Sequence, residues 1–352
     1  MVIFSSNHWR VEQLEEQVVR LKMIIDKQAE QLLSSLIMSE SHGFYLVDAF
    51  TKSHFGGNQA AVIIAGKTIS DEVKQRLAAE FNLSETAFPE PRNGDYKTAS
   101  HFDLRWFTPT VEIDLCGHAT LATAHVIFNE IGNQNSELIF ETVLRGNLSV
   151  IRGENGHLAM NFPQYDIVSL NFDGQNAFSD RFLEVQAPNF LPDLLNCIHF
   201  GELKLQGIVH TPVGKKLVVV LDGKPTRDQF AQLSCDYNKM LEIVPTDVWL
   251  HGIIVTFSPK SPEQGFVQDD GTLYDYVCRF FAPWSGVNED PATGSAQCGL
   301  GPFWRAVLNK KQLKGHQAYS GRGADFIISF PSEGRVQIEG NTVTVVKGQL
   351  SL

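Results

Sequence analysis

Residues 114–125, DLCGHATLATAH, place two side chains able to do chemistry at the start of a run of small residues. Cys116 and His118 flank Gly117, and the alanines and threonines that follow predict a helix thin enough to be packed on every side. The first N–H groups of a helix lack partners within it and carry a partial positive charge. This helix start could therefore bind a carboxylate or a developing oxyanion, although an ordinary buried helix would show the same pattern.

Glu85 is a second candidate for chemistry. It stands in a short apolar stretch, between Leu83 and the pair Ala87 and Phe88. Apolar surroundings disfavour the charged form of a carboxyl group, so we expect a raised pKa that suits a group moving protons. A solvated glutamate at the edge of a strand is the alternative.

The segment around the small-residue helix occurs twice. Residues 105–109 (RWFTP) precede the first helix, and residues 279–283 (RFFAP) lead into residues 288–299, NEDPATGSAQCG. The second stretch is another polar opening followed by small residues, and similar strand and turn patterns follow each copy. A repeat of this length predicts two similar lobes and not a solenoid. If the lobes face each other, the two helix starts meet at one cleft.

The sequence indicates neither a metal nor a cofactor. His118 and His125 share a helix face but lie about 10.5 Å apart along the axis, which is too far for one ion. The phosphate-binding pattern G-x-x-x-x-G-K-[ST] and the serine hydrolase pattern G-x-S-x-G do not occur. Metal binding, nucleotide hydrolysis and serine hydrolysis therefore have little support from the sequence.

Cys116 could itself be a nucleophile or base, because a nearby helix start would lower the pKa of its thiol. A racemase that works with two thiols needs a second cysteine at the matching place in the other copy. Aligning the two helices puts Thr293 there, and threonine is no base at neutral pH. Cys298 lies further into the second helix, where we expect it to be buried.

The composition is that of a globular protein of 352 residues, with 43% hydrophobic and 20% charged residues. A net charge of −11 without a basic cluster argues against a nucleic-acid partner. No apolar run reaches the roughly 18 residues of a membrane span. The five cysteines form no C-x-x-C pair, and the first residues do not resemble a secretory signal. These features predict a cytoplasmic protein without a membrane partner.

The chain divides into an N-terminal segment and two lobes. Residues 10–38 predict a helix from apolar residues at heptad spacing, which are Val11, Leu14, Val18, Leu21, Ile25 and Leu32. This helix either lies on the body or is a coiled coil or a segment that docks to another protein. We expect helix and linker in residues 1–43, a first lobe in 44–165 and a second in 166–352, whose last strand could return to the first lobe.

Four motifs together resemble the phenazine-biosynthesis PhzF-like family, in the diaminopimelate epimerase-like superfamily. They are residues 55–58 (FGGN), 83–86 (LSET), 116–120 (CGHAT) and 289–295 (EDPATGS), in this order over most of residues 44–352. The resemblance implies an α+β fold with two similar lobes, each a twisted and partly closed β-sheet around a central helix. It also implies a cofactor-free site in the cleft, and we expect a homodimer.

The resemblance implies roles for individual residues. Glu85 would shuttle a proton between carbons of a small cyclic carboxylic acid, with His118 and Asp290 assisting. The substrate would be bound by residues around the two helix starts, namely Asn58, Cys116, Gly117, Ala119, Thr293, Gly294 and Ser295. Thr293 replaces the second cysteine of the epimerase relatives, which puts epimerisation by two thiols in doubt.

The leading hypothesis is therefore a cofactor-independent isomerase that acts on a small carboxylated metabolite. Two alternatives stay open at this point. One is a binding or scaffold protein that engages a partner through residues 10–38, and the other is an amino-acid racemase or epimerase that uses Cys116.

Overall fold

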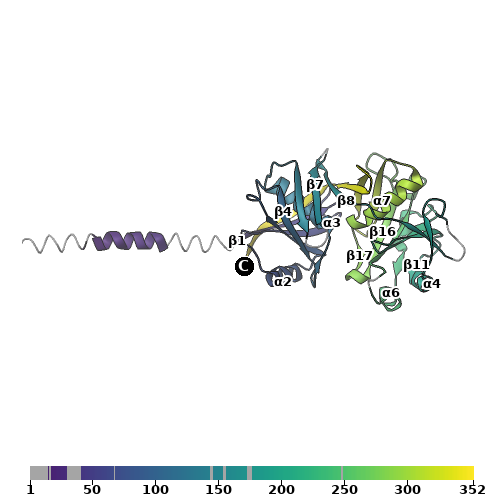
Figure 1. The fold of residues 1–352 in the computed structure, drawn as a ribbon, viewed down its shortest axis with the longest axis horizontal. Coiled ribbons are helices and arrows are strands. Elements are labelled where there is room, and N and C mark those ends of the chain that lie inside the picture. Colours follow the sequence, from purple (N-terminus) through teal and green to yellow (C-terminus); the bar gives the residue numbers. More distant parts are fainter. Residues whose placement is uncertain are drawn as a thin grey trace, which may run out of the picture.

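A computed structural model describes the body of the chain almost completely (Figure 1). The described residues are 15, 17–29, 41–66, 68–142, 146–153, 156–172, 177–246 and 249–352. Residues 17–29 form a helix with exposed side chains, and the folded body follows it. The body begins with a strand at Ser41, three residues before the start that we expected.

The first half of the body builds a sheet around one helix. Its elements are β1 (Ser41–Ala49), β2 (Asn58–Ile64), α2 (Asp71–Phe81), β3 (Glu85–Pro91), β4 (His101–Phe107), β5 (Glu112–Ile113), α3 (Gly117–His125), a π-helical segment (Val126–Glu130), β6 (Glu137–Thr142), β7 (Gly146–Arg152) and β8 (Leu158–Pro163). Along the sheet the pairs are β1–β2 antiparallel, β2–β3 parallel, β3–β4 antiparallel, β4–β6 parallel, then β6–β7 and β7–β8 antiparallel.

The second half contains more elements. They are β9 (Val168–Asn171), β10 (Leu183–Gln186), α4 (Leu191–Asn196), β11 (Ile198–His199), β12 (Leu205–Thr211), β13 (Lys216–Leu221), α5 (Arg227–Gln232), β14 (Ser234–Cys235), α6 (Tyr237–Ile243), β15 (Gly252–Phe257), β16 (Tyr276–Ala282), β17 (Val287–Asp290), α7 (Gly294–Leu308), β18 (Gln312–Gln317), β19 (Ala324–Ser329), β20 (Arg335–Gly340) and β21 (Thr342–Ser351). Short 3₁₀ turns at Pro262–Gln264 and Pro283–Ser285 complete it.

The pairing order of the first half repeats in the second. The pairs are β12–β13 antiparallel, β13–β15 parallel, β15–β16 antiparallel, β16–β18 parallel, then β18–β19 and β19–β20 antiparallel. The central helices occupy matching places, because α3 lies between β4 and β6 in the chain and α7 between β16 and β18. The fold is therefore an internal duplication, as the repeated motifs predicted.

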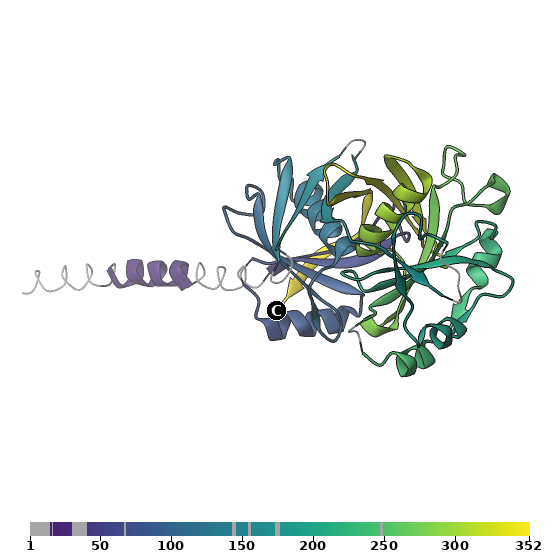
Figure 2. The ribbon, with the colours of Figure 1, turned by 45° about the vertical axis from the view of Figure 1, so that its right-hand side comes forward.

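Two strand pairs connect the halves. β8 pairs with β20, and the C-terminal strand β21 lies antiparallel to β1. Figure 2 shows β21, in yellow, reaching across to the first half. Through these pairs, nineteen strands of the described residues form one hydrogen-bonded network.

The central helices are buried because their residues are small. All nine residues of α3 are buried, and the hydroxyls of Thr120 and Thr123 donate to the carbonyls of Cys116 and Ala119 within the same helix. Satisfying these hydroxyls inside the helix lets it sit in an apolar core. α7 is buried along most of its length, from Gly294 to Trp304, with Ser295 only partly covered.

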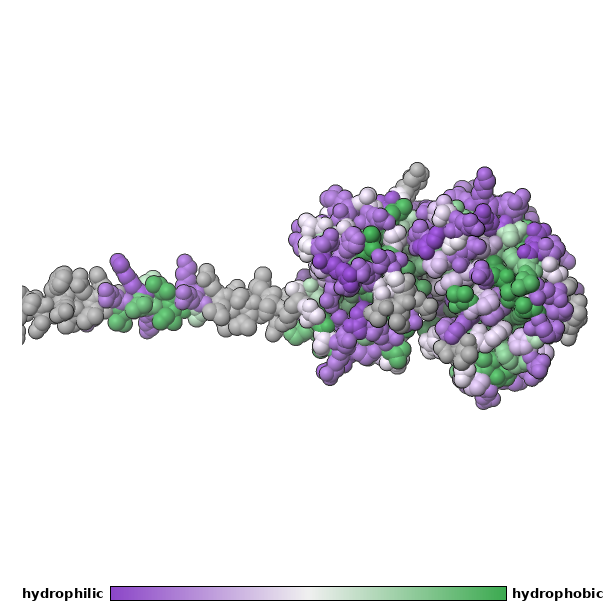
Figure 3. Space-filling model, viewed as in Figure 1, coloured by the Kyte–Doolittle hydropathy of each residue, from purple (hydrophilic) through white to green (hydrophobic). Residues whose placement is uncertain are grey.

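The α+β fold class agrees with the expectation, and the two-lobe description is consistent with the duplicated halves. The lobe boundaries stay a prediction, and β9 and β10 follow the expected boundary at residue 165. Figure 3 shows apolar side chains on the helix of residues 17–29, where Val18, Leu21 and Ile25 are exposed. Val11, Leu14 and Leu32 of the expected heptads lie outside the described residues. None of the helices that the structure describes has the length and apolarity to cross a membrane.

Candidate active site

The starts of α3 and α7 meet at a pair of glycines. A methyl group added to Gly117 would lie 3.2 Å from Cα of Gly294, and one added to Gly294 would lie 3.3 Å from Cα of Gly117. Such distances leave no ordinary room for a side chain on either residue. The absence of a side chain at both positions therefore lets two positively polarised helix ends approach each other.

A cavity of about 460 Å³ opens at this meeting point. Glu85, Cys116, Gly117, His118, Asp290, Thr293, Gly294 and Ser295 are among the residues that line it. Its walls come from both halves of the duplicated fold. A cavity of this size suits a small molecule.

Glu85, the first residue of β3, contacts the imidazole of His118. Their Oε2 and Nε2 atoms are 2.9 Å apart, and Oε2 is buried. Burial alone would raise the pKa of Glu85, but the charge of His118 and hydrogen bonds to the carboxylate outweigh it and lower the pKa. Our expectation of a raised pKa was therefore wrong, because it counted the apolar neighbours in the sequence and not His118.

His118 is enclosed by polar groups on both ring nitrogens. Nδ1 lies 3.2 Å from Nδ2 of Asn58 and 3.4 Å from the sulfur of Cys116, and Nε2 lies 3.3 Å from the hydroxyl of Ser84. Burial disfavours the charged imidazole, but Cys116 and Glu85 outweigh it and raise the pKa of His118 well above its usual value. Glu85 and His118 therefore form a buried ion pair at the cavity wall.

Asp290 is the second carboxyl group at the site. Burial raises its pKa to about 6, so it binds a proton far more readily than a solvated aspartate. Asn58 donates to its Oδ1 at 2.7 Å, and the hydroxyl of Thr293 donates to its Oδ2. The amide of Gln317 donates to the main-chain carbonyl of Asp290 at 2.6 Å. This carboxyl group is thus fixed in place between the halves.

Cys116 is a poor candidate for a base. Burial, reinforced by the charge of Glu85, raises the pKa of its thiol to about 11. We had expected the helix start to lower this pKa, and that expectation was wrong because burial dominates. Thr293, at the matching place in the second half, donates through its hydroxyl to Asp290.

Glu85, Cys116 and His118 offer three donor atoms within 4.8 Å of one another, a set that could hold a metal ion. Nε2 of His118 already contacts Glu85 in the ion pair, so a metal ion would have to replace that contact. His125 is not part of this group, because its ring bonds to the hydroxyls of Thr342 and Thr344 at 2.6 and 2.9 Å.

Most of the residues predicted for the site line this cavity, and the other two, Ala119 and Asn58, are not among its lining residues. Ala119 is fully buried, and Asn58 acts on the wall through its bonds to Asp290 and His118. Sequence reasoning missed further lining residues, which are Ser84, Tyr165, Lys215, Lys216 and His251. The pair of lysines after Gly214 was the one visible signal among them.

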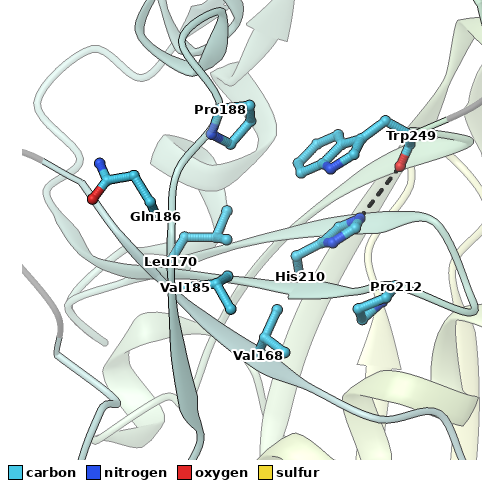
Figure 4. Close-up of a pocket in the computed structure, with 8 residues that line it drawn as sticks. All are labelled: Val168, Leu170, Val185, Gln186, Pro188, His210, Pro212 and Trp249. Carbon is cyan, nitrogen blue, oxygen red and sulfur yellow. Dashed lines mark hydrogen bonds between the residues drawn. The ribbon is translucent and has the colours of Figure 1, made fainter.

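A separate hollow of about 340 Å³ lies in the second half between β9, β10 and β12 (Figure 4). His210 stacks on Trp249 there, with ring centroids 4.0 Å apart, and burial lowers its pKa to about 4. Among the described residues that line this hollow, His210 is the one titratable group, and it is neutral at physiological pH. The hollow therefore offers no pair of groups for acid–base chemistry.

Comparison with known proteins agrees with this geometry. Residues 47–348 match the family model described as phenazine biosynthesis-like protein. A mouse phenazine biosynthesis-like domain-containing protein is 37% identical over 310 residues, which cover 87% of this chain and 98% of the relative. A protein of Halalkalibacterium halodurans, described as an uncharacterized isomerase, is 35% identical over 88% of this chain and 98% of its own length.

The solved structures agree as well. A PhzF-family phenazine biosynthesis protein from Enterococcus faecalis superposes with a TM-score of 0.69 at 31% identity, covering 89% of this chain and all of that one. The α+β body of this chain is thus a known type of fold. This chain belongs to the phenazine biosynthesis-like, or PhzF, family.

Proposed function

We propose that this protein is an isomerase that moves a proton between carbons of a small carboxylated metabolite, with Glu85 as the general acid and base. One observation carries the proposal, namely a buried pair of Glu85 and His118 in a cavity where two helix starts meet. The description of a relative as an isomerase supports the same reaction class. The two proton-transfer steps of this reaction need no cofactor.

The first step is removal of a proton from carbon. The lowered pKa keeps Glu85 ionised at neutral pH, as a base must be, while the imidazolium of His118 offsets its charge. The C–H bond breaks, its proton passes to the carboxylate, and its electron pair forms an enolate-like system. The helix starts at Gly117 and Gly294 are placed to stabilise that negative charge and the substrate carboxylate.

The second step returns the proton to a different carbon. Protonated Glu85 donates it there, the electron pair of the enolate-like system forms the new C–H bond, and the carboxylate is regenerated. The substrate and product are then isomers, and no proton is gained or lost overall. Asp290, with its pKa of about 6, can share a proton with a substrate oxygen during the reaction. A single acid–base group suffices because it takes up the proton in the first step and returns it in the second, and Thr293, at the second thiol position, supplies no further base.

The test is proton exchange in the variant Glu85→Gln. Small carboxylates are first screened for thermal stabilisation of the protein, and bound compounds are then followed in D₂O by NMR for deuterium uptake at carbon. We expect Glu85→Gln to slow exchange by about 10²–10⁴-fold, the usual contribution of a positioned acid or base. Glu80→Gln, on the exposed face of α2, serves as the matched control. Undiminished exchange in Glu85→Gln would remove Glu85 from the role.

Removal of residues 1–40 separates this proposal from the scaffold hypothesis. The cavity is lined by residues 84–295, and β1 begins at Ser41, so an enzyme should retain its exchange activity after the truncation. A scaffold that acts through the N-terminal helix should instead lose its partner. Docking of a protein partner to residues 10–38, homodimer formation and a cytoplasmic location all stay predictions.

A further inference from the structure

The turn between β12 and β13 forms one wall of the cavity. Val213, Gly214, Lys215 and Lys216 all line it, and they come from the second half of the fold. The proposed acid–base chemistry uses none of them. Two adjacent lysines at the wall of a small cavity offer positive charge to a bound molecule.

The turn is fixed to α7, the helix whose start lies at the site. The hydroxyl of Thr211 accepts from the N–H of Lys216 at 3.3 Å and closes the turn. A methyl group added to Gly299 of α7 would lie 2.7 Å from the methyl carbon of Thr211, so the turn packs directly on the helix. A methyl group added to Gly214 would come equally close to the ring of Tyr165. The N–H of Tyr165 in turn donates to the carbonyl of Cys298 in α7 at 2.9 Å.

The lysines are therefore held at set positions relative to the helix start. Lys216 is 6% exposed, and its Nζ donates to the carbonyl of Gly214 at 3.1 Å. The same nitrogen lies 5.7 and 5.9 Å from the ring centroids of Tyr165 and Phe280, two residues that also line the cavity. Lys215 is half-buried, with its carbonyl accepting from the N–H of His251 at 2.7 Å.

Most of the carboxylates of the cavity lie in the first half. They are Glu85, Glu112 and Asp114, with Asp290 contributed by β17 of the second half, and Glu112 is paired with Arg105 at 2.7 Å. The wall formed by residues 165–287 holds both lysines and His251, and no described lining residue of that wall is acidic. A bound molecule thus meets positive charge at the helix starts and again at this wall.

We propose that Lys215 and Lys216 form a second anion subsite, and that the substrate is a small dicarboxylate. One carboxylate binds at the helix starts beside Gly117 and Gly294, and the other binds at the lysines. The inference rests on the proposed isomerase and names its substrate class. A second carboxylate can accept charge-assisted hydrogen bonds from the lysines, which are stronger than bonds between neutral groups.

The test compares ligand pairs that differ by one carboxylate, glutarate with butyrate and isophthalate with benzoate, by isothermal titration calorimetry. We expect the full-length protein to bind at least one diacid about tenfold or more tightly than its monoacid, as one charge-assisted bond allows. Lys216→Met should abolish this preference by weakening diacid binding more than monoacid binding. Lys215→Asn, which suits the left-handed backbone at φ 48°, should reduce it too.

Lys224→Gln is the matched control, because the side chain of Lys224 is 83% exposed in the same half. Circular dichroism checks that each variant is folded, and Lys215→Asn covers the case in which buried Lys216 cannot be replaced. An unchanged preference in the folded lysine variants, or no preference in the wild type, would overturn the proposal. Glu85→Gln should keep the preference for diacids, so failure of the isomerase proposal shows separately in the exchange assay.

Discussion

The glycine pair at the helix starts offers the most direct test of how the fold makes the site. In Gly117→Ala the added methyl group meets Cα of Gly294 at 3.2 Å, and in Gly294→Ala it meets Cα of Gly117 at 3.3 Å. In both variants the contact is with main chain, so relief requires the two helix starts to separate by a few tenths of an ångström. Overpacking of this kind costs about 1–3 kcal/mol of folding free energy.

The larger effect should be on function. A misplacement of about 1 Å can cost about 10²-fold in rate, so we expect roughly tenfold losses in exchange rate and in monocarboxylate affinity. Gly301→Ala is the control, since its methyl group would meet the side chain of Ile328 at 2.8 Å, inside the core and away from the cavity.

Thermal unfolding gives the stability change, and calorimetry with benzoate gives the affinity. The expected pattern is a comparable loss of stability in all three variants, with a loss of binding in Gly117→Ala and Gly294→Ala alone. If these two variants bind benzoate as well as Gly301→Ala does, the approach of the helix starts does not create the anion site, and the reasoning is refuted.

Two further predictions concern stability. The folded state raises the pKa of Asp290 to about 6 from 3.8, so its contribution is fully present below pH 3.8 and is lost as the pH rises through 6. Asp290→Asn should therefore gain about 2 kcal/mol relative to the wild type between pH 4 and pH 7.5, as measured by urea unfolding, and a pH-independent difference would contradict this pKa. Arg279→Met should cost about 3–5 kcal/mol, because the buried guanidinium pairs with Glu289 and donates to the carbonyl of Leu233. Its counterpart Arg105→Met, whose ion pairs are more exposed, should cost about 1 kcal/mol or less in the same assay, and equal losses would argue against burial as the cause.

The parts of the fold that depend on local signals were predictable from the sequence. Ser70 caps α2 by accepting from the N–H of Val73, and α3 and α7 begin at the glycines that open the small-residue runs. The duplication was visible because the two copies keep their turn residues and apolar spacing. These features each depend on a few neighbouring residues.

The electrostatics of the site could not be predicted in the same way. The pKa of Glu85 is decided by His118, which is distant in sequence and comes from another element. The pKa of the Cys116 thiol is decided by the depth of its burial, which no short motif encodes. Lys216 lines the cavity, and the turn that carries it packs through Thr211 on Gly299, a contact between segments far apart in the chain. The site residues quoted from motifs meet in the structure, while their catalytic roles stay a prediction.

The duplication also indicates why one half carries the acid–base group. Glu85 begins β3 and pairs with β2 in parallel, and Gly252 begins β15 and pairs with Lys216 of β13 in the same manner. The second half therefore has a glycine where the first has its carboxylate. A methyl group on Gly252 would lie 2.4 Å from the ring of Phe280, which lines the cavity, so a side chain there would displace the cavity wall. Two equal scaffolds thus face the cavity with unequal groups, with Glu85 in the first half and a glycine at the matching place of the second. This asymmetry favours a proton that leaves and returns through one residue over exchange between two opposed bases.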